Sequence, residues 1–166
     1  MIPPRLKLVL DEVAPIAQSL VASGFRAYLV GGIVRDQLLG KELGPKADID
    51  LTTDANPEQI KAAVGPIADA LWTQGERFGT IRIKLGEREF EITTHRGEVY
   101  EADSRKPSVQ FGKEIAADLS RRDFTVNAMA IEVGQGEPRL VDNHGGAADL
   151  HNKILRTPLD PEISFS

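Results

Sequence analysis

The stretch LVGGIVRDQLLG, residues 29–40, places two glycines between a short apolar run and a segment with helical character. Glycine adopts backbone angles that other residues avoid, so Gly31 and Gly32 predict a tight turn from a strand into a helix. Backbone N–H groups at a helix start can bind phosphate, and Arg35 can add charge-assisted hydrogen bonds. A plain glycine turn followed by a surface arginine is the alternative interpretation.

A second stretch, ADIDLTT at residues 47–53, follows closely and has the pattern of a strand. Because side chains alternate along a strand, Asp48 and Asp50 lie on one face. Two carboxylates on one face suit magnesium, which prefers oxygen ligands and often shares them with phosphate groups. Solvent-facing acids without a metal are the alternative. The nearness of the acid pair to the glycine turn favours a site for a nucleoside triphosphate with magnesium.

A third acid comes from REFEITT, residues 88–94, where Glu89 and Glu91 share one strand face. Glu91 would lie beside the aspartates if this strand neighbours residues 47–53. The preceding segment GTIRIKL, residues 79–85, is a further strand, and the short turn between the two predicts a hairpin.

The rest of the chain alternates helical and extended patterns. Apolar spacing predicts a helix over 5–23, and NPEQIKAAV predicts another, with Asn56 as its cap and Pro57 as its first residue. Gly40 is expected to end the helix that follows the glycine turn. Further segments are a buried strand at 27–30, a polar loop at 95–112, a helix and then a strand within 113–133, and a strand, helix and strand within 139–158. This order indicates an α+β, or mixed α/β, class with a largely antiparallel sheet.

Length and composition bound the possibilities. The 166 residues suit one domain, and 41% hydrophobic with 27% charged residues is typical of a globular protein. The formal net charge of -5 argues against a surface that binds nucleic acid everywhere, and the absence of cysteine excludes disulfides and cysteine-ligated zinc. A signal-peptide pattern and a membrane-length apolar run are both missing, so we expect a cytoplasmic protein with no membrane partner. The ending DPEISFS has no stop pattern, and we expect a piece of a longer protein.

Four ordered motifs resemble those of the class II tRNA nucleotidyltransferases, the bacterial CCA-adding enzymes and poly(A) polymerases. They are LVGGIVRDQLLG with ADIDLTT, FGTIRI with FEITTHRGEVYEADSRKPSVQFG, DLSRRDFTVNAMAI, and LVDNHGGAADLHNKILRTP. The resemblance covers residues 27–166 and implies a polymerase β-like fold. It implies that residues 1–166 are the nucleotidyltransferase head domain, without the neck, body and tail that bind most of the tRNA.

The resemblance also implies roles for individual residues. Asp48 and Asp50 match the catalytic aspartates that bind two Mg²⁺ ions, and Glu91 matches a third, more variable metal-site acid. Six further positions match nucleotide-binding residues: Gly31, Gly32 and Arg35 for the triphosphate, and Arg122, Asp123 and Asn127 for the ribose. A carboxylate and an amide can both hydrogen-bond a 2′-hydroxyl. Helix capping by the last two residues is the alternative.

Other polar residues receive less specific interpretations. Structural roles are predicted for three acids: Asp36, paired with a nearby arginine, and Asp142 and Asp149, in the last motif. Arg96 faces phosphate or pairs with Glu98. Surface positions without a catalytic role are predicted for the three histidines: His95, His144 and His151.

The resemblance implies transfer of a nucleotide from CTP or ATP to an RNA 3′ end, most simply CCA addition to tRNA, with release of pyrophosphate. A poly(A) polymerase is the rival within the same enzyme class. A non-catalytic module of the same fold that binds nucleotide or RNA is the rival outside it, although such a module has no need for two mutually repelling aspartates. The base-reading element of the family would follow residue 166.

Overall fold

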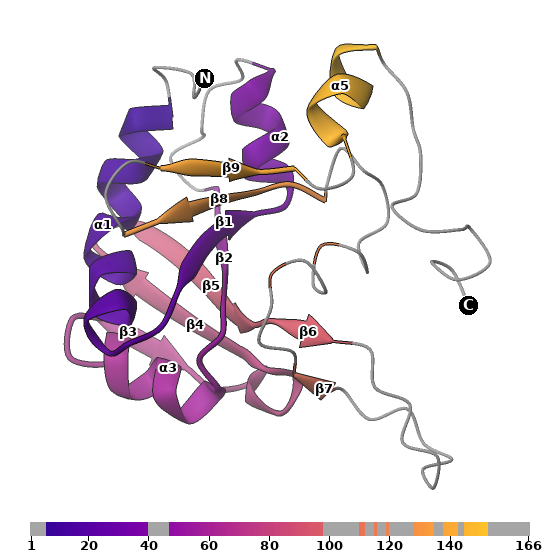
Figure 1. The fold of residues 1–166 in the computed structure, drawn as a ribbon. Helices are drawn as coiled ribbons and strands as arrows, with labels where there is room; N and C mark the ends of the chain where they lie inside the picture. Colours follow the sequence, from indigo (N-terminus) through magenta and orange to yellow (C-terminus); the bar gives the residue numbers. More distant parts are fainter. Residues whose placement is uncertain are drawn as a thin grey trace, which may run out of the picture.

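The computed structural model describes residues 6–39, 47–97, 110–111, 115, 119, 128–134, 138–142 and 145–152 (Figure 1). The elements along the chain are α1 (Leu6–Ala22), β1 (Ala27–Val30), α2 (Gly32–Leu38), β2 (Ile49–Thr53), α3 (Pro57–Val64), β3 (Ala70–Trp72), the 3₁₀ turn η1 (Glu76–Phe78), β4 (Thr80–Leu85), β5 (Arg88–Thr94), β6 (Arg96–Gly97), β7 (Gln110–Phe111), β8 (Ala130–Val133), β9 (Arg139–Val141) and α5 (Gly146–His151).

Seven strands form one sheet in the order β3-β4-β5-β2-β1-β8-β9. The pairing of β2 with β5 is parallel, and the other neighbours described are antiparallel. The expected mixed, largely antiparallel sheet is therefore confirmed. The predicted loop at 95–112 was wrong in part, because β6 and β7 pair with each other at its two ends.

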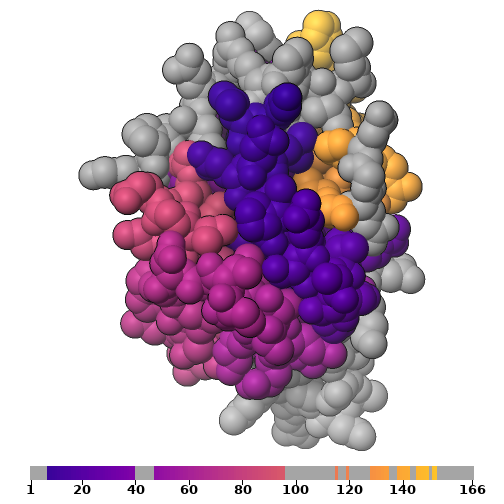
Figure 2. All heavy atoms as spheres, turned by 90° about the vertical axis from the view of Figure 1, so that its left-hand side faces the viewer, coloured from indigo at the N-terminus to yellow at the C-terminus, as the bar shows by residue number. Residues whose placement is uncertain are grey.

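One face of the sheet carries the main core. Helices α1 and α3 contact each other and pack on this face, and Figure 2 shows α1 running across that side of the molecule. Fully buried strand residues meet the helices there, among them Leu51, Ile83 and Ile92. Burial of each such side chain stabilises the fold by about 1.5–3 kcal/mol. This apolar face fixes which strand residues point away from the helices.

The opposite face is more polar. The strand register places Asp50 beside Glu91, Glu91 beside Arg82, and Tyr28 beside both Thr52 and Glu132. A small apolar cluster covers the β1–β8 part of this face: Tyr28, Val30, Leu119, Ala128 and Ala130. The acids lie beyond that cluster, towards β2, β5 and β4.

Local sequence rules account for several elements. Asn56 and Gln59 form a capping box at the start of α3, with Pro57 as the first helical residue, so that prediction is confirmed. The predicted strands at 27–30, 47–53, 79–85 and 88–94, the hairpin and the first helix are present, with ends shifted by one or two residues.

Two short elements were missed, and some predictions are not tested. Strand β3 and turn η1 have no clear periodic pattern in the sequence. Gly40, most of residues 113–127 and residues 153–158 lie outside the described residues. Among the helices described, none combines the length and the apolar character needed to cross a lipid bilayer.

Candidate active site

The glycine turn between β1 and α2 forms one side of the candidate site. Gly31 has φ 80° and ψ -151°, a region of backbone space that is essentially restricted to glycine. A Cβ atom on Gly32 would lie 3.2 Å from Arg35 Nη2, so the guanidinium lies next to this turn. Arg35 Nε also donates to Asp36 Oδ1 at 3.1 Å, which confirms the predicted pairing of Asp36 with an arginine. The turn thus carries a cationic group beside two glycines.

The two aspartates lie at the beginning of β2. Ile49 and Leu51 point into the main core, so Asp48 and Asp50 project from the opposite face, as the alternation predicted. Asp50 is the register partner of Glu91 in β5, which confirms that the strand at 88–94 neighbours the strand at 47–53. Asp48 remains partly exposed, with 41% of its side-chain surface accessible.

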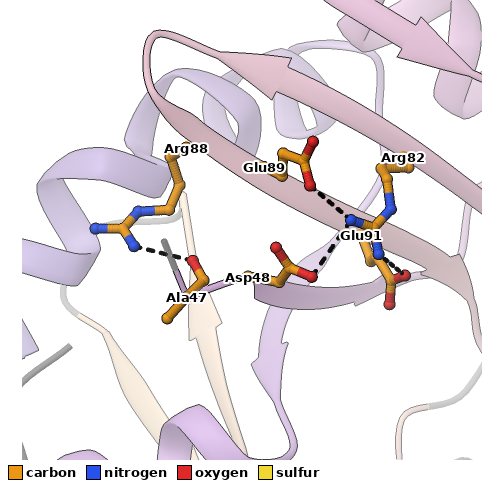
Figure 3. Close-up of polar contacts among 6 residues, drawn as sticks. All are labelled: Ala47, Asp48, Arg82, Arg88, Glu89 and Glu91. Atoms are coloured by element: carbon orange, nitrogen blue, oxygen red, sulfur yellow. Dashed lines mark hydrogen bonds and ion pairs between the residues drawn. The ribbon is translucent and has the colours of Figure 1, made fainter. Parts of the chain in front are cut away.

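Arg82 bridges Asp48, just before β2, and two glutamates of β5 (Figure 3). Its Nη2 donates to Glu91 Oε1 at 2.6 Å, and its Nη1 donates to Glu89 Oε2 at 2.7 Å. The same Nη1 lies 3.3 Å from Asp48 Oδ2. The hydrogen bond to Glu91, together with the nearby carboxylate charges, raises the pKa of Arg82 above its ordinary value. Arg82 was not among the predicted site residues, although its place in the hairpin opposite Glu91 could have suggested it.

The acid pair fits a magnesium ion that is shared with phosphate. Within the part of the chain that the structure describes, no group of three or more carboxylates or imidazoles is arranged to hold a metal. Magnesium often takes only one or two protein carboxylates and completes its shell with phosphate oxygens and water. Asp48 and Asp50 supply two such hard donors on one face, and Arg82 contacts Asp48 as well as Glu91. The donor set is therefore adequate if a triphosphate supplies the remaining ligands.

Arg88 fixes the backbone just before Asp48. Its Nη1 donates to the carbonyl oxygen of Ala47 at 2.9 Å, as Figure 3 shows. Its Nε and Nη2 donate to the two carboxylate oxygens of Glu12 in α1, at 2.8 and 3.2 Å. Only 12% of the Arg88 side chain is exposed. This arginine joins α1, β5 and the entry to β2, and sequence analysis gave no signal for it.

His95 is buried, so its predicted surface position was wrong. Its backbone N–H donates to Thr53 O at 2.8 Å and continues the parallel pairing of β2 with β5. Its Nδ1 lies 2.7 Å from Thr52 Oγ1, and its ring centroid lies 5.5 Å from that of Tyr28. A polar ring is tolerated at this depth because Thr52 pairs with it. Of the other two histidines, His151 is exposed as expected, and His144 lies outside the described residues.

A second buried ionic group lies further along the same sheet face. Glu132 in β8 accepts a hydrogen bond from Arg139 Nη2 at 3.0 Å. Its Oε2 forms an ion pair with Arg26 Nε at 2.9 Å, without hydrogen-bond geometry. Burial, and then the Glu132 charge, raise the pKa of Tyr28. These contacts pair the Glu132 carboxylate with two arginines of the fold, so we assign it a structural role.

The remaining predicted residues divide into two groups. The Asp142 carboxylate accepts hydrogen bonds from the backbone N–H groups of Gly146 and Ala147, at 2.6 and 3.0 Å, and Asp149 is buried in α5, which agrees with structural roles for both acids. Three residues were predicted to contact the ribose: Arg122, Asp123 and Asn127. They lie outside the described residues, and so does Glu98. Arg96 opens β6.

Comparison with known proteins agrees with this geometry. The CCA-adding enzyme of Bacillus licheniformis is 40% identical over 155 residues, which cover 93% of this chain and 36% of the relative. That of Streptococcus suis is 41% identical over 157 residues, covering 94% and 36%. The chain thus spans little more than a third of the length of these relatives.

Solved structures show the same fold. A Bacillus stearothermophilus CCA-adding enzyme in complex with CTP matches with a TM-score of 0.76 and 32% identity, over 98% of this chain and 36% of the other. A tRNA nucleotidyltransferase complexed with a primer tRNA and an incoming ATP analog matches with a TM-score of 0.69 and 36% identity, over 87% and 39%. These matches confirm the polymerase β-like fold.

The profile of the family described as the poly A polymerase head domain matches residues 27–156. This range includes the glycine turn, both aspartates and the hairpin that carries Arg82 and Glu91. The family resemblance of the four sequence motifs is thereby confirmed, and the chain belongs to the poly A polymerase head domain family.

Proposed function

We propose that this chain is the catalytic head of a template-independent RNA nucleotidyltransferase that adds CCA to tRNA 3′ ends from CTP and ATP and releases pyrophosphate. The carrying observation is the projection of Asp48 and Asp50 from one face of the sheet, opposite the main core, in a chain of this family. Support for the substrates comes from relatives that are CCA-adding enzymes, one solved with CTP. A cytoplasmic location is part of this proposal.

The proposed site residues have two roles, metal binding and triphosphate binding. Asp48 and Asp50 would hold Mg²⁺, and Gly31, Gly32 and Arg35 receive the triphosphate. Magnesium, when bound, would activate the RNA 3′-hydroxyl and neutralise part of the triphosphate charge. The chain's own groups orient the nucleotide for in-line attack, and catalysis rests on positioning and electrostatics. The reaction requires no side-chain nucleophile.

Three further residues complete the proposed nucleotide site. Arg122, Asp123 and Asn127 are proposed to contact the ribose, on the strength of the RRDFTVNA motif. A site that hydrogen-bonds a hydroxyl group rejects the analogue that lacks it. The ribose contacts would therefore favour ribonucleotides. Poly(A) synthesis stays the second candidate, because the matching family profile is named for that activity.

The aspartates provide the decisive test. In the full-length protein, Asp48→Asn or Asp50→Asn should lower the rate of CTP or ATP incorporation into tRNA lacking its CCA end by at least about 100-fold, or about 2.7 kcal/mol of transition-state stabilisation. Each substitution removes a carboxylate needed for the metal while it keeps the side-chain shape. The measurement is radiolabelled nucleotide addition in the presence of Mg²⁺.

The exposed Asp11→Asn change in α1 is the matched control, because it removes the same charge away from the site. Incorporation by either site variant at the wild-type rate would contradict the proposal. Extension of tRNA by many adenosines, with no use of CTP, would select the poly(A) alternative.

A further inference from the structure

A single guanidinium lies among the acids of the candidate site. Arg82 contacts Asp48, Glu89 and Glu91, and its side chain is 34% exposed. Its three contacts differ in length: 2.6 Å to Glu91, 2.7 Å to Glu89 and 3.3 Å to Asp48. Arg82 is thus held firmly by two glutamates of β5 and reaches across to Asp48, the residue just before β2.

This arrangement matters for any cation that binds Asp48. A magnesium ion coordinates a carboxylate oxygen at about 2.1 Å. Arg82 Nη1 lies 3.3 Å from Asp48 Oδ2, so an ion on that oxygen would lie within about 5–6 Å of the guanidinium nitrogen. Two positive charges at this separation repel appreciably, even in partly exposed surroundings.

We propose that Arg82 is a built-in counter-cation of Asp48: it holds the Asp48 carboxylate in the absence of metal and opposes the binding of magnesium alone. The inference rests on the proposed metal-binding role of Asp48 and Asp50. When a metal ion replaces Arg82 as the partner of Asp48, the guanidinium keeps its ion pairs with Glu89 and Glu91. Arg82 therefore does not become an unpaired charge. Binding of the metal then depends on the negative charge that a triphosphate brings.

Removal of the Arg82 charge should strengthen magnesium binding in the absence of nucleotide. Thermal unfolding of the protein is followed over a series of Mg²⁺ concentrations, since a ligand that binds only the folded state raises the melting temperature. In Arg82→Gln and in Arg82→Met, the Mg²⁺ dissociation constant fitted to this stabilisation should fall about three- to tenfold, where tenfold corresponds to about 1.4 kcal/mol. Both variants should melt below the wild type when no metal is present, because the acids then repel one another.

Two controls separate this role from a merely structural one. Arg82→Lys keeps the charge and should keep the wild-type Mg²⁺ dissociation constant, although it loses the bridging geometry. Arg77→Gln removes an equal charge from an arginine that lies 4.7 Å from the centroid of the Phe78 ring, and it should leave this dissociation constant unchanged. A simple loss of packing would lower the melting temperature without a change in the Mg²⁺ dissociation constant.

The inference is overturned if folded Arg82→Gln and Arg82→Met respond to Mg²⁺ at the wild-type concentration. It is equally overturned if the gain in Mg²⁺ affinity persists in the double variant Asp48→Asn with Arg82→Gln, because the ion then binds elsewhere. Absence of any Mg²⁺ response in all variants would also refute it. The nucleotide-addition assay judges the proposed function separately, so failure of one is distinguishable from failure of the other.

Discussion

At the scale of single residues, the two glycines of the turn have different tasks. Gly31 occupies a backbone region that side chains with a Cβ atom rarely adopt, whereas Gly32 leaves room for the guanidinium of Arg35. The first requirement concerns folding, and the second concerns the shape of the proposed triphosphate site. Substitutions at neighbouring positions should therefore have separable effects.

Gly31→Ala should lower the free energy of unfolding by about 1–3 kcal/mol, because alanine is strained at φ 80° and ψ -151°. Gly32→Ala should cost less stability, since its new Cβ meets only the flexible end of Arg35. It should instead weaken triphosphate binding. Denaturant unfolding and calorimetry with CTP measure the two effects. Equal losses of stability in both variants would contradict this division.

At the scale of elements, the entry to β2 is held by contacts from two distant parts of the chain. Arg88 of β5 binds Ala47 and the Glu12 carboxylate of α1, which lies 76 positions away in the sequence. The start of β2 carries Asp48, so this bridge sets where the first proposed metal ligand lies. Arg88 acts through the backbone and is a positioning residue.

Arg88→Ala should lower the free energy of unfolding by about 1.5–3 kcal/mol through the loss of hydrogen bonds that involve charged groups. It should also reduce the rate of nucleotide addition more than it changes KM, because Asp48 loses its placement. Arg88→Lys should restore part of the stability. Glu12→Gln keeps the Ala47 contact and should impair the rate less than Arg88→Ala. Wild-type kinetics in folded Arg88→Ala would show that the bridge serves stability alone.

At the scale of the whole molecule, α1 and α3 cover one face of the sheet and leave part of the other face to the acids. Two glycines, Arg35 and the aspartates are proposed to bind phosphate and metal, and Arg122, Asp123 and Asn127 are proposed to bind the ribose. All nucleoside triphosphates share these features. Discrimination between bases requires hydrogen bonds to base edges, which these groups do not supply.

The 166-residue chain should therefore bind CTP, ATP, GTP and UTP with affinities within about tenfold of one another, a range of about 1.4 kcal/mol. Magnesium should strengthen the binding of all four nucleotides equally, because it bridges the aspartates and the phosphates. Calorimetry with each nucleotide, with and without Mg²⁺, tests both statements. A larger preference for CTP or ATP would place base selection within the head itself.

Features that depend on near neighbours in the chain could be predicted from the sequence alone. Alternation along a strand placed Asp48 and Asp50 on one face, the short turn between 79–85 and 88–94 defined the hairpin, and Asn56 with Pro57 marked the start of α3. Each follows from backbone geometry over a few residues, which local spacing reveals. The motifs also identified the family, although they did not identify every residue of the site.

The pairing of strands that are distant in the sequence could not be predicted in this way. The parallel pairing of β2 with β5 brings Glu91 beside Asp50, and the hairpin then carries Arg82 to Asp48, 34 positions away in the sequence. The same pairing buries His95, which looked like a surface residue. Buried or clustered polar groups are stable only with partners, and partners that are distant in sequence leave no periodic signal. The counter-charge of the acid pair and the support of β2 therefore became visible only in the folded chain.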